Sequence, residues 1–151
     1  MTEMTVRSIG VIRSPFTDPG GTPIQPRFAR GVAGALEVDP AYAGALNDLS
    51  GFERIWVLYL FDRARPFHAE VVPYLDTVAR GLFATRSPAR PNPIGMSAWR
   101  LLEVSGTIVR VADVDVLDGT PLLDIKPYVP AFDAFTDSRA GWLERALETT
   151  T

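Results

Sequence analysis

Three prolines within six residues, Pro88, Pro91 and Pro93, limit what the middle of this chain can become. Each proline fixes its own φ angle and lacks a backbone N–H, and each keeps the preceding residue out of the helical region. The surrounding stretch, residues 83–97 (FATRSPARPNPIGMS), therefore cannot form a helix or pair as a central strand. The sequence predicts a stiff, extended loop that presents polar side chains at a low entropic cost.

Two guanidinium groups in this stretch, from Arg86 and Arg90, indicate an anionic ligand. Arginine offers a planar fork that matches the geometry of a carboxylate or a phosphate. The alternative is an ordinary proline-rich connection on the surface, and the composition of the stretch does not separate the two interpretations.

The composition excludes several kinds of chemistry. The chain has 151 residues, of which 46% are hydrophobic and 22% charged, as in a soluble globular domain with its own core. It has no cysteine and only one histidine, His68, which argues against disulfides, thiol catalysis and a metal site. Neither a membrane span of about 20 apolar residues nor a signal peptide is expected. These features predict a cytoplasmic protein with no metal and no membrane partner.

The charge distribution separates two parts of the chain. The net charge of −3 argues against a general nucleic-acid coat protein. Residues 1–110 nevertheless hold 12 arginines against 10 acidic residues, whereas residues 111–151 hold 3 basic against 8 acidic residues. The basic charge is therefore concentrated in the part that contains the proline-rich stretch.

Alternating apolar residues and turn signals predict a series of short strands. They are expected at 6–12, 34–38, 52–61, 96–104, 107–112, 113–118 and 122–125. The most hydrophobic run, 52–61, is expected to be a central strand buried on both faces. The run at 113–118 alternates valine or leucine with aspartate, which predicts a strand with an acidic edge.

Helices are expected at only two places. Asp39 and Pro40 predict the start of a helix that runs to about Leu49, and Asp137 is expected to cap a short amphipathic helix at about 138–148. Residues 16–30 and 126–130 are expected to be loops. Many short strands with few helices favour an all-β barrel or sandwich.

Five groups of residues carry a resemblance to a known family. They are Ile9–Pro15, Gly51-Phe52 with Ile55–Val57, Phe83–Pro88 with Arg90–Gly95, Leu117–Pro121, and Asp124–Tyr128. With these motifs, residues 6–133 resemble the TsaA-like family of TrmO-type tRNA N6-methyltransferases. The resemblance implies one all-β domain over 1–151, a small β-barrel with core 6–133 and a few short peripheral helices, that forms a homodimer.

The resemblance also implies an activity. The cofactor is expected to be S-adenosyl-L-methionine, bound near the dimer interface. The partner is expected to be tRNA, methylated on N6 of threonylcarbamoyladenosine at position 37. One alternative is an S-adenosylmethionine-binding regulatory or partner-binding module without this activity, and another is methylation of a small molecule or a protein.

The family's cofactor contacts carry over to particular positions of this chain. They are Gln25, Pro26, Arg27, Asp62, Arg63, Arg86, Met96, Leu117, Asp118, Gly119 and Thr120. Arg86 is expected to pair with the cofactor's carboxylate or with an RNA phosphate, and Asp118 with its amine or ribose. Substrate contacts are expected at Arg90, Asn92, Lys126 and Tyr128, the last through stacking.

No catalytic residue is predicted, because the acceptor is a urea-type nitrogen for which a strong general base is unnecessary. Two features depart from the family pattern. Asp62 stands where the family commonly has histidine, and this chain stops at Thr151, whereas many bacterial members carry an extra C-terminal domain.

Overall fold

The computed structural model describes residues 2–150, which form two compact units. The first comprises the chain up to Arg63 together with Ile94–Tyr128, and the second comprises Ala64–Pro93 with the chain from Val129 onward. Each unit is described by itself below. A single domain over 1–151 stays a prediction.

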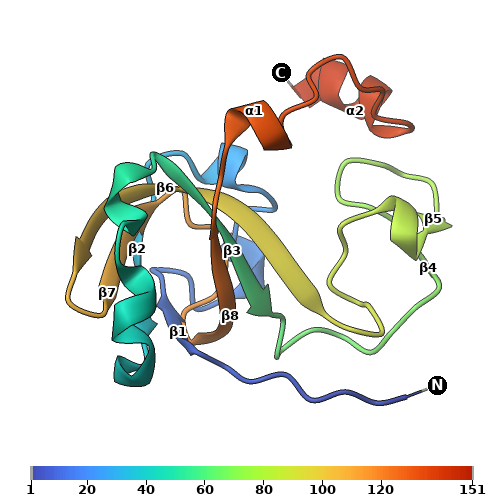
Figure 1. Ribbon diagram of the computed structural model, residues 1–151. Coiled ribbons are helices and arrows are strands. Elements are labelled where there is room, and N and C mark those ends of the chain that lie inside the picture. Colours follow the sequence, from blue (N-terminus) through green and yellow to red (C-terminus); the bar gives the residue numbers. More distant parts are fainter. Residues whose placement is uncertain (1, 151) are drawn as a thin grey trace. The chain divides into compact units, whose positions relative to one another are not determined.

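Six strands of the described chain close into an antiparallel barrel in the order β1-β2-β7-β6-β3-β8 (Figure 1). They are β1 (Gly10–Arg13), β2 (Ala33–Val38), β3 (Arg54–Leu60), β6 (Ile94–Ser105), β7 (Ile108–Ala112) and β8 (Thr120–Pro127). The predicted all-β barrel is confirmed. The barrel closes where β1 pairs with β8, with Gly10 opposite Leu122. Only glycine fits at this position, because a Cβ on Gly10 would lie 2.1 Å from the Glu37 carbonyl oxygen of β2.

The barrel interior is filled by alternate residues of the strands. The side chains with no exposed surface are those of Ile12, Leu36, Ile55, Val57, Trp99, Val109, Val111, Val114 and Leu122. The predicted central strand is confirmed as β3, which pairs with β6 and β8. The prediction that both of its faces are buried is wrong. Ile55, Val57 and Tyr59 point inward. The alternate residues Trp56 and Leu58 lie on the outer face and are only half-buried. A closed barrel has one interior, so period-two burial results even in a wholly apolar strand.

The segment between β7 and β8 is not the predicted strand. Asp113 has a φ angle of 75°, which takes the chain out of the β7 ladder. Residues 111–116 are all buried, and Asp113 and Asp115 expose only 4% and 8% of their surface. The predicted acidic edge is therefore wrong for these two aspartates, which lie inside the first unit with polar partners described below.

Short 3-10 helices replace the predicted helix at 39–49. They are η3 (Pro40–Leu46) and η4 (Leu49–Gly51), and two others, η1 (Pro19–Gly21) and η2 (Pro26–Ala29), lie in the predicted loop at 16–30. The predicted cap is present, since Asp39 Oδ1 accepts a hydrogen bond from the Ala41 N–H at 2.9 Å.

The second unit contains little regular structure. Its elements are β4 (Glu70–Val71), β5 (Arg80–Gly81), η5 (Leu82–Ala84), α1 (Pro130–Asp133) and α2 (Leu143–Thr150). Residues 85–93, hereafter the proline loop, have no strand or helix, whereas Ile94–Ser97 of the proline-rich stretch already pair in β6. The C-terminal helix begins five residues later than predicted, after Gly141 at a φ of 56°. The predicted loop at 126–130 is shorter, because Lys126 and Pro127 pair with β3.

No helix among residues 2–150 combines the length and the apolar character that crossing a bilayer requires.

Candidate cofactor and RNA site

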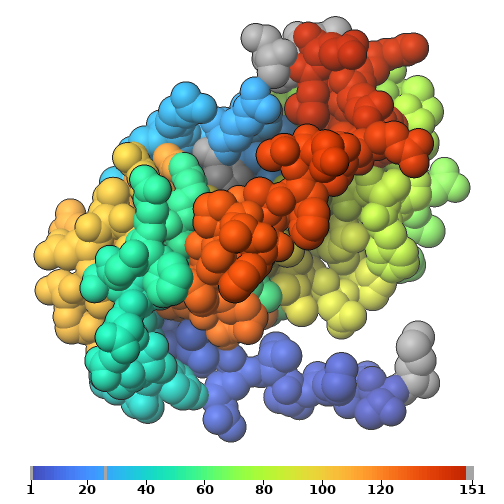
Figure 2. Space-filling model, turned by 45° about the horizontal axis from the view of Figure 1, so that its top comes forward, coloured from blue at the N-terminus to red at the C-terminus, as the bar shows by residue number. Residues whose placement is uncertain are grey.

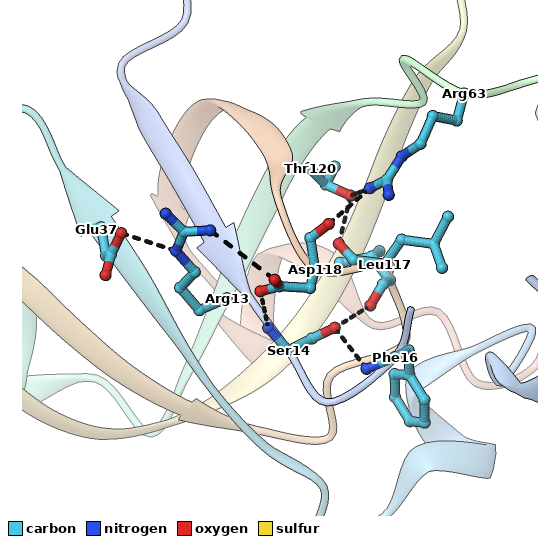
Figure 3. Close-up of polar contacts among 9 residues, drawn as sticks. Arg13, Ser14, Phe16, Glu37, Arg63, Leu117, Asp118 and Thr120 are labelled. Carbon is cyan, nitrogen blue, oxygen red and sulfur yellow. Dashed lines mark hydrogen bonds and ion pairs between the residues drawn. The ribbon is translucent and has the colours of Figure 1, made fainter. Parts of the chain in front are cut away.

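Four of the predicted cofactor residues form a hydrogen-bonded cluster between the end of β3 and the start of β8 (Figure 3). Arg63 Nη2 donates to the Asp118 carbonyl oxygen at 2.8 Å and lies 3.5 Å from Thr120 Oγ1. Thr120 Oγ1 donates in turn to the Leu117 carbonyl oxygen at 2.6 Å. The guanidinium of Arg63 therefore fastens the turn that leads into β8.

The turn at residues 117–120 has a geometry that requires its glycine. The Thr120 N–H donates to the Leu117 carbonyl oxygen at 3.3 Å, and Gly119, at the third position, has a φ angle of 83°. A positive φ at this position is characteristic of a type II turn and favours glycine. The Gly119 N–H donates to Ile12 of β1 at 2.8 Å. The turn is thus tied to β1 through its backbone.

The carboxylate of Asp118 also faces the end of β1. Its Oδ1 accepts from the Ser14 N–H at 3.0 Å, and its Oδ2 lies 3.9 Å from Arg13 Nη1 (Figure 3). The hydrogen bond of Arg13 to Glu37, followed by the Glu37 charge, raises the pKa of Arg13 above its usual value. The Asp118 side chain remains 37% exposed, so Oδ2 can accept a further hydrogen bond from a ligand.

The other predicted residues of the first unit lie at several places on its surface. Asp62 is exposed, with Oδ1 at 3.5 Å from Arg63 Nε. Met96 is 56% exposed on the outer face of β6. Lys126 Nζ lies 3.1 Å from Asp124 Oδ2, and the Tyr128 ring packs edge-on against Trp56 at 5.4 Å between centroids.

The segment with Gln25 and Arg27 is anchored by a buried acid. Gln25 precedes η2, Arg27 is exposed within it, and the side chain of Pro26 lies outside the described part of the structure. Asp113 Oδ1 accepts from the Gly31 N–H at 2.7 Å, just beyond η2, and Asp113 Oδ2 lies 3.2 Å from Arg54 Nη2. The barrel therefore fixes one end of this segment through a single carboxylate.

Arg90 is turned into its own loop. Its Nη1 donates to the carbonyl oxygens of Thr85 at 2.9 Å and Ser87 at 3.0 Å, and lies 3.5 Å from that of Leu82. The guanidinium carbon also lies 5.6 Å from the centroid of the Phe83 ring. Arg90 therefore holds together backbone groups of its own loop. The Arg86 side chain is exposed.

Some of the residues that shape the site were not predicted from the sequence. Asp113 was predicted to belong to an acidic strand edge, because valine or leucine alternates with aspartate over 113–118. Ser14 and Arg13 belong to the motif Ile9–Pro15, but their contact with Asp118 was not predicted, because Asp118 lies 104 residues from Ser14.

The available groups suit S-adenosylmethionine in their chemistry. S-adenosylmethionine carries a carboxylate, an amine, ribose hydroxyls, an adenine ring and a positively charged sulfonium. In the first unit, Asp118 has a partly exposed acceptor of the kind that an amine or a ribose hydroxyl binds, and Met96 has an exposed apolar surface. In the second unit, Arg86 has an exposed guanidinium, the kind of group that pairs with a carboxylate. Among residues 2–150, no group of three or more acidic or histidine side chains is placed to hold a metal ion.

Comparisons with known proteins agree with this fold and these motifs. Residues 11–134 match the family model described as the tRNA-methyltransferase O N-terminal domain. A probable S-adenosyl-L-methionine-binding protein of Pyrococcus abyssi is 51% identical over 139 residues, which cover 92% of this chain and 76% of that protein.

Two further relatives carry the names tRNA (adenine(37)-N6)-methyltransferase and TrmO. The tRNA (adenine(37)-N6)-methyltransferase of Escherichia coli is 37% identical over 158 residues, with 97% of this chain and 66% of the relative covered. The crystal structure of TrmO from Pseudomonas aeruginosa superposes with a TM-score of 0.80 at 39% identity. That match covers 93% of this chain but 62% of the solved one, so the chain spans less than two thirds of that relative. The match to the family model includes both the proline loop and the turn at 117–120, and the chain belongs to the tRNA-methyltransferase O N-terminal domain family.

Proposed function

We propose that this protein is an S-adenosylmethionine-dependent methyltransferase that methylates N6 of threonylcarbamoyladenosine at position 37 of tRNA. The observation that carries the proposal is the family match over residues 11–134, which includes the proline loop and the turn at 117–120. The name of the Escherichia coli relative supports the adenine at position 37 as the acceptor. Homodimer formation and a cytoplasmic location belong to the same proposal.

The chemistry suits a site without a metal or a covalent nucleophile. S-adenosylmethionine supplies a methyl group on a sulfonium, and its transfer to nitrogen is a direct displacement. The protein's task is therefore to align the methyl donor with the acceptor, for which effective molarities are large. Arg63 fixes the turn that carries Asp118, and the exposed Arg86 is the proposed partner of the cofactor's carboxylate. Asn92, Lys126 and Tyr128 are the proposed contacts to tRNA.

A transfer assay tests the activity. The protein is incubated with methyl-labelled cofactor and with tRNA that carries or lacks the threonylcarbamoyl group, and a matched tRNA with guanosine at position 37 serves as the control. We expect label only in the modified tRNA. Cofactor binding without transfer would contradict the proposal in favour of a binding module. Equal label in unmodified tRNA would contradict the threonylcarbamoyl substrate. In a cell extract, label that remains in protein or small molecules after ribonuclease treatment would instead indicate one of those substrates.

A second prediction separates an RNA contact from a loop-forming role at Arg90. Because its guanidinium binds carbonyls of the proline loop, Arg90→Ala should weaken cofactor binding about tenfold or more, since a hydrogen bond to a charged group contributes about 1.5–3 kcal/mol. It should leave the salt dependence of tRNA binding unchanged. A lost phosphate contact would instead lower the slope of log K against log salt by about 0.7–0.9, and that result would return Arg90 to the RNA side. Arg65→Ala, at an exposed arginine of the same unit, is the matched control.

A further inference from the structure

Trp142 joins the C-terminal segment of the second unit to the residue that precedes the proline loop. Its indole Nε1 donates to the Ala84 carbonyl oxygen at 2.8 Å. Ala84 ends η5, and the next residue, Thr85, is bonded back to Leu82 through its N–H at 3.0 Å and its hydroxyl at 2.8 Å. Figure 2 shows the red C-terminal segment against the yellow-green stretch. The indole thus holds the point at which the chain enters the loop.

A second contact fixes the indole from the β5 side. The Arg80 guanidinium carbon lies 5.6 Å from the centroid of the Trp142 ring, a cation–π distance. Arg80 Nε donates to Asp76 Oδ2 at 2.7 Å. That hydrogen bond, followed by the one from the Thr77 N–H, lowers the pKa of Asp76 below its usual range. Asp76 is therefore a persistent anion that keeps Arg80 over the ring at neutral pH.

A turn before α2 orients Trp142. The Leu143 N–H donates to the Ala140 carbonyl oxygen at 3.1 Å, and Gly141 has a φ angle of 56°, which glycine adopts most readily. Glu144 Oε1 accepts from the Ala140 N–H at 3.0 Å and so binds the first turn of the helix to the residues that precede it. Trp142 therefore projects from a turn whose backbone is held by hydrogen bonds.

We infer that Trp142 is a positioning residue, which holds the proline loop in the conformation that presents Arg86 to the cofactor. The part of this inference that concerns the cofactor rests on the proposed function. Residues 135–150 lie outside the region that matches the family model, so the family assignment gives this segment no role. In this inference Trp142 acts through its contacts with the Ala84 carbonyl and the Arg80 side chain.

Hydrogen exchange tests the structural part of the inference. In Trp142→Ala, the amides of Leu82 and Thr85, which are bonded to Ala69 and Leu82 carbonyls, should exchange at least about tenfold faster. The amides of the β3 ladder in the barrel should exchange at the wild-type rate. Trp142→Phe, which keeps an aromatic ring for Arg80 but loses the N–H and part of the ring surface, should give a smaller increase. Arg145→Ala, at an exposed position of α2, is the control and should change neither region.

Cofactor titration tests the functional part. Trp142→Ala should raise the dissociation constant and the KM for S-adenosylmethionine about tenfold, while the rate at saturating cofactor stays within about twofold of wild type. This pattern indicates lost binding and not a lost transition-state contact. Unchanged exchange at Leu82 and Thr85 overturns the inference, and so does a loosened loop with unchanged cofactor affinity. If the wild-type protein binds no cofactor, the proposed function fails, and the exchange comparison alone still decides whether Trp142 holds the loop.

Discussion

Replacing Arg86 with alanine should raise the dissociation constant of S-adenosylmethionine by about tenfold to a hundredfold. A charge-assisted hydrogen bond contributes about 1.5–3 kcal/mol, and each 1.4 kcal/mol corresponds to about a tenfold change in affinity. The free energy of unfolding of the variant, measured by denaturant titration, separates an effect on cofactor binding from an effect on folding.

Calorimetric titration of the cofactor into three variants measures this effect. Arg86→Lys keeps the charge but loses the planar fork, so it should fall between wild type and Arg86→Ala. Arg65→Ala should bind as the wild type does. If Arg86→Ala binds the cofactor normally but shows a smaller salt dependence of tRNA binding, then Arg86 contacts an RNA phosphate, which is the other partner expected for this guanidinium.

Replacing Asp115 with alanine should lower the free energy of unfolding by about 2–6 kcal/mol, because two buried donors lose their acceptor at about 1–3 kcal/mol each. Asp115 Oδ1 accepts from Ser97 Oγ at 2.9 Å and from Trp99 Nε1 at 3.0 Å. The Tyr59 hydroxyl extends this network to Ser97 at 2.7 Å. All four residues are buried within the barrel unit, where water cannot replace the missing carboxylate without opening the core.

The aromatic residues around this network leave little room for rearrangement. The rings of Tyr59 and Trp99 stack with centroids 5.9 Å apart, and a Cβ at Gly95 would lie 2.3 Å from Tyr59 Cε2. Denaturant titration of Asp115→Ala measures the loss of stability. Asp124→Ala, at a more exposed aspartate of β8, is the control and should stay near wild type. An Asp115→Ala variant within about 0.5 kcal/mol of wild type would show that the network adds no stability.

Local sequence signals predicted those parts of the fold that depend on neighbours in the chain. The run at 52–61 became β3, the strands predicted at 96–104 and 107–112 became β6 and β7, and Asp39 capped η3. The segment at 113–118 was predicted wrongly because its period-two pattern does not come from a strand ladder: residues 113–116 are all buried, and Asp113 and Asp115 have polar partners there. Residue patterns alone also left barrel and sandwich open, since closure depends on pairing between β1 and β8.

Residues of the candidate site could be predicted only where they belong to a sequence motif of the family. The resemblance pointed to Arg63 and to residues 117–120, and the structure joins them through hydrogen bonds. The position of Arg90 was not predictable, because its partners are backbone carbonyls that any sequence would supply. Trp142 lies in the segment predicted as an amphipathic helix, and its indole N–H binds a residue 58 positions away. Such contacts depend on how the chain folds back on itself, and composition does not report them.

The pairing of β1 with β8 has a consequence for how the protein folds. The Ser14 N–H and the Asp118 carboxylate that meet at this seam are 104 residues apart in sequence, and contacts over such separations slow folding. Two hydrogen bonds of the turn at 117–120, from the Gly119 N–H to Ile12 and from the Ser14 N–H to Asp118, form only when the first strand docks. A ligand that binds this turn only when the barrel is closed raises the stability of the closed barrel by RT ln(1 + [L]/Kd). When the protein refolds, cofactor binding should therefore appear in the slowest kinetic phase, after most of the circular-dichroism signal of the strands has returned.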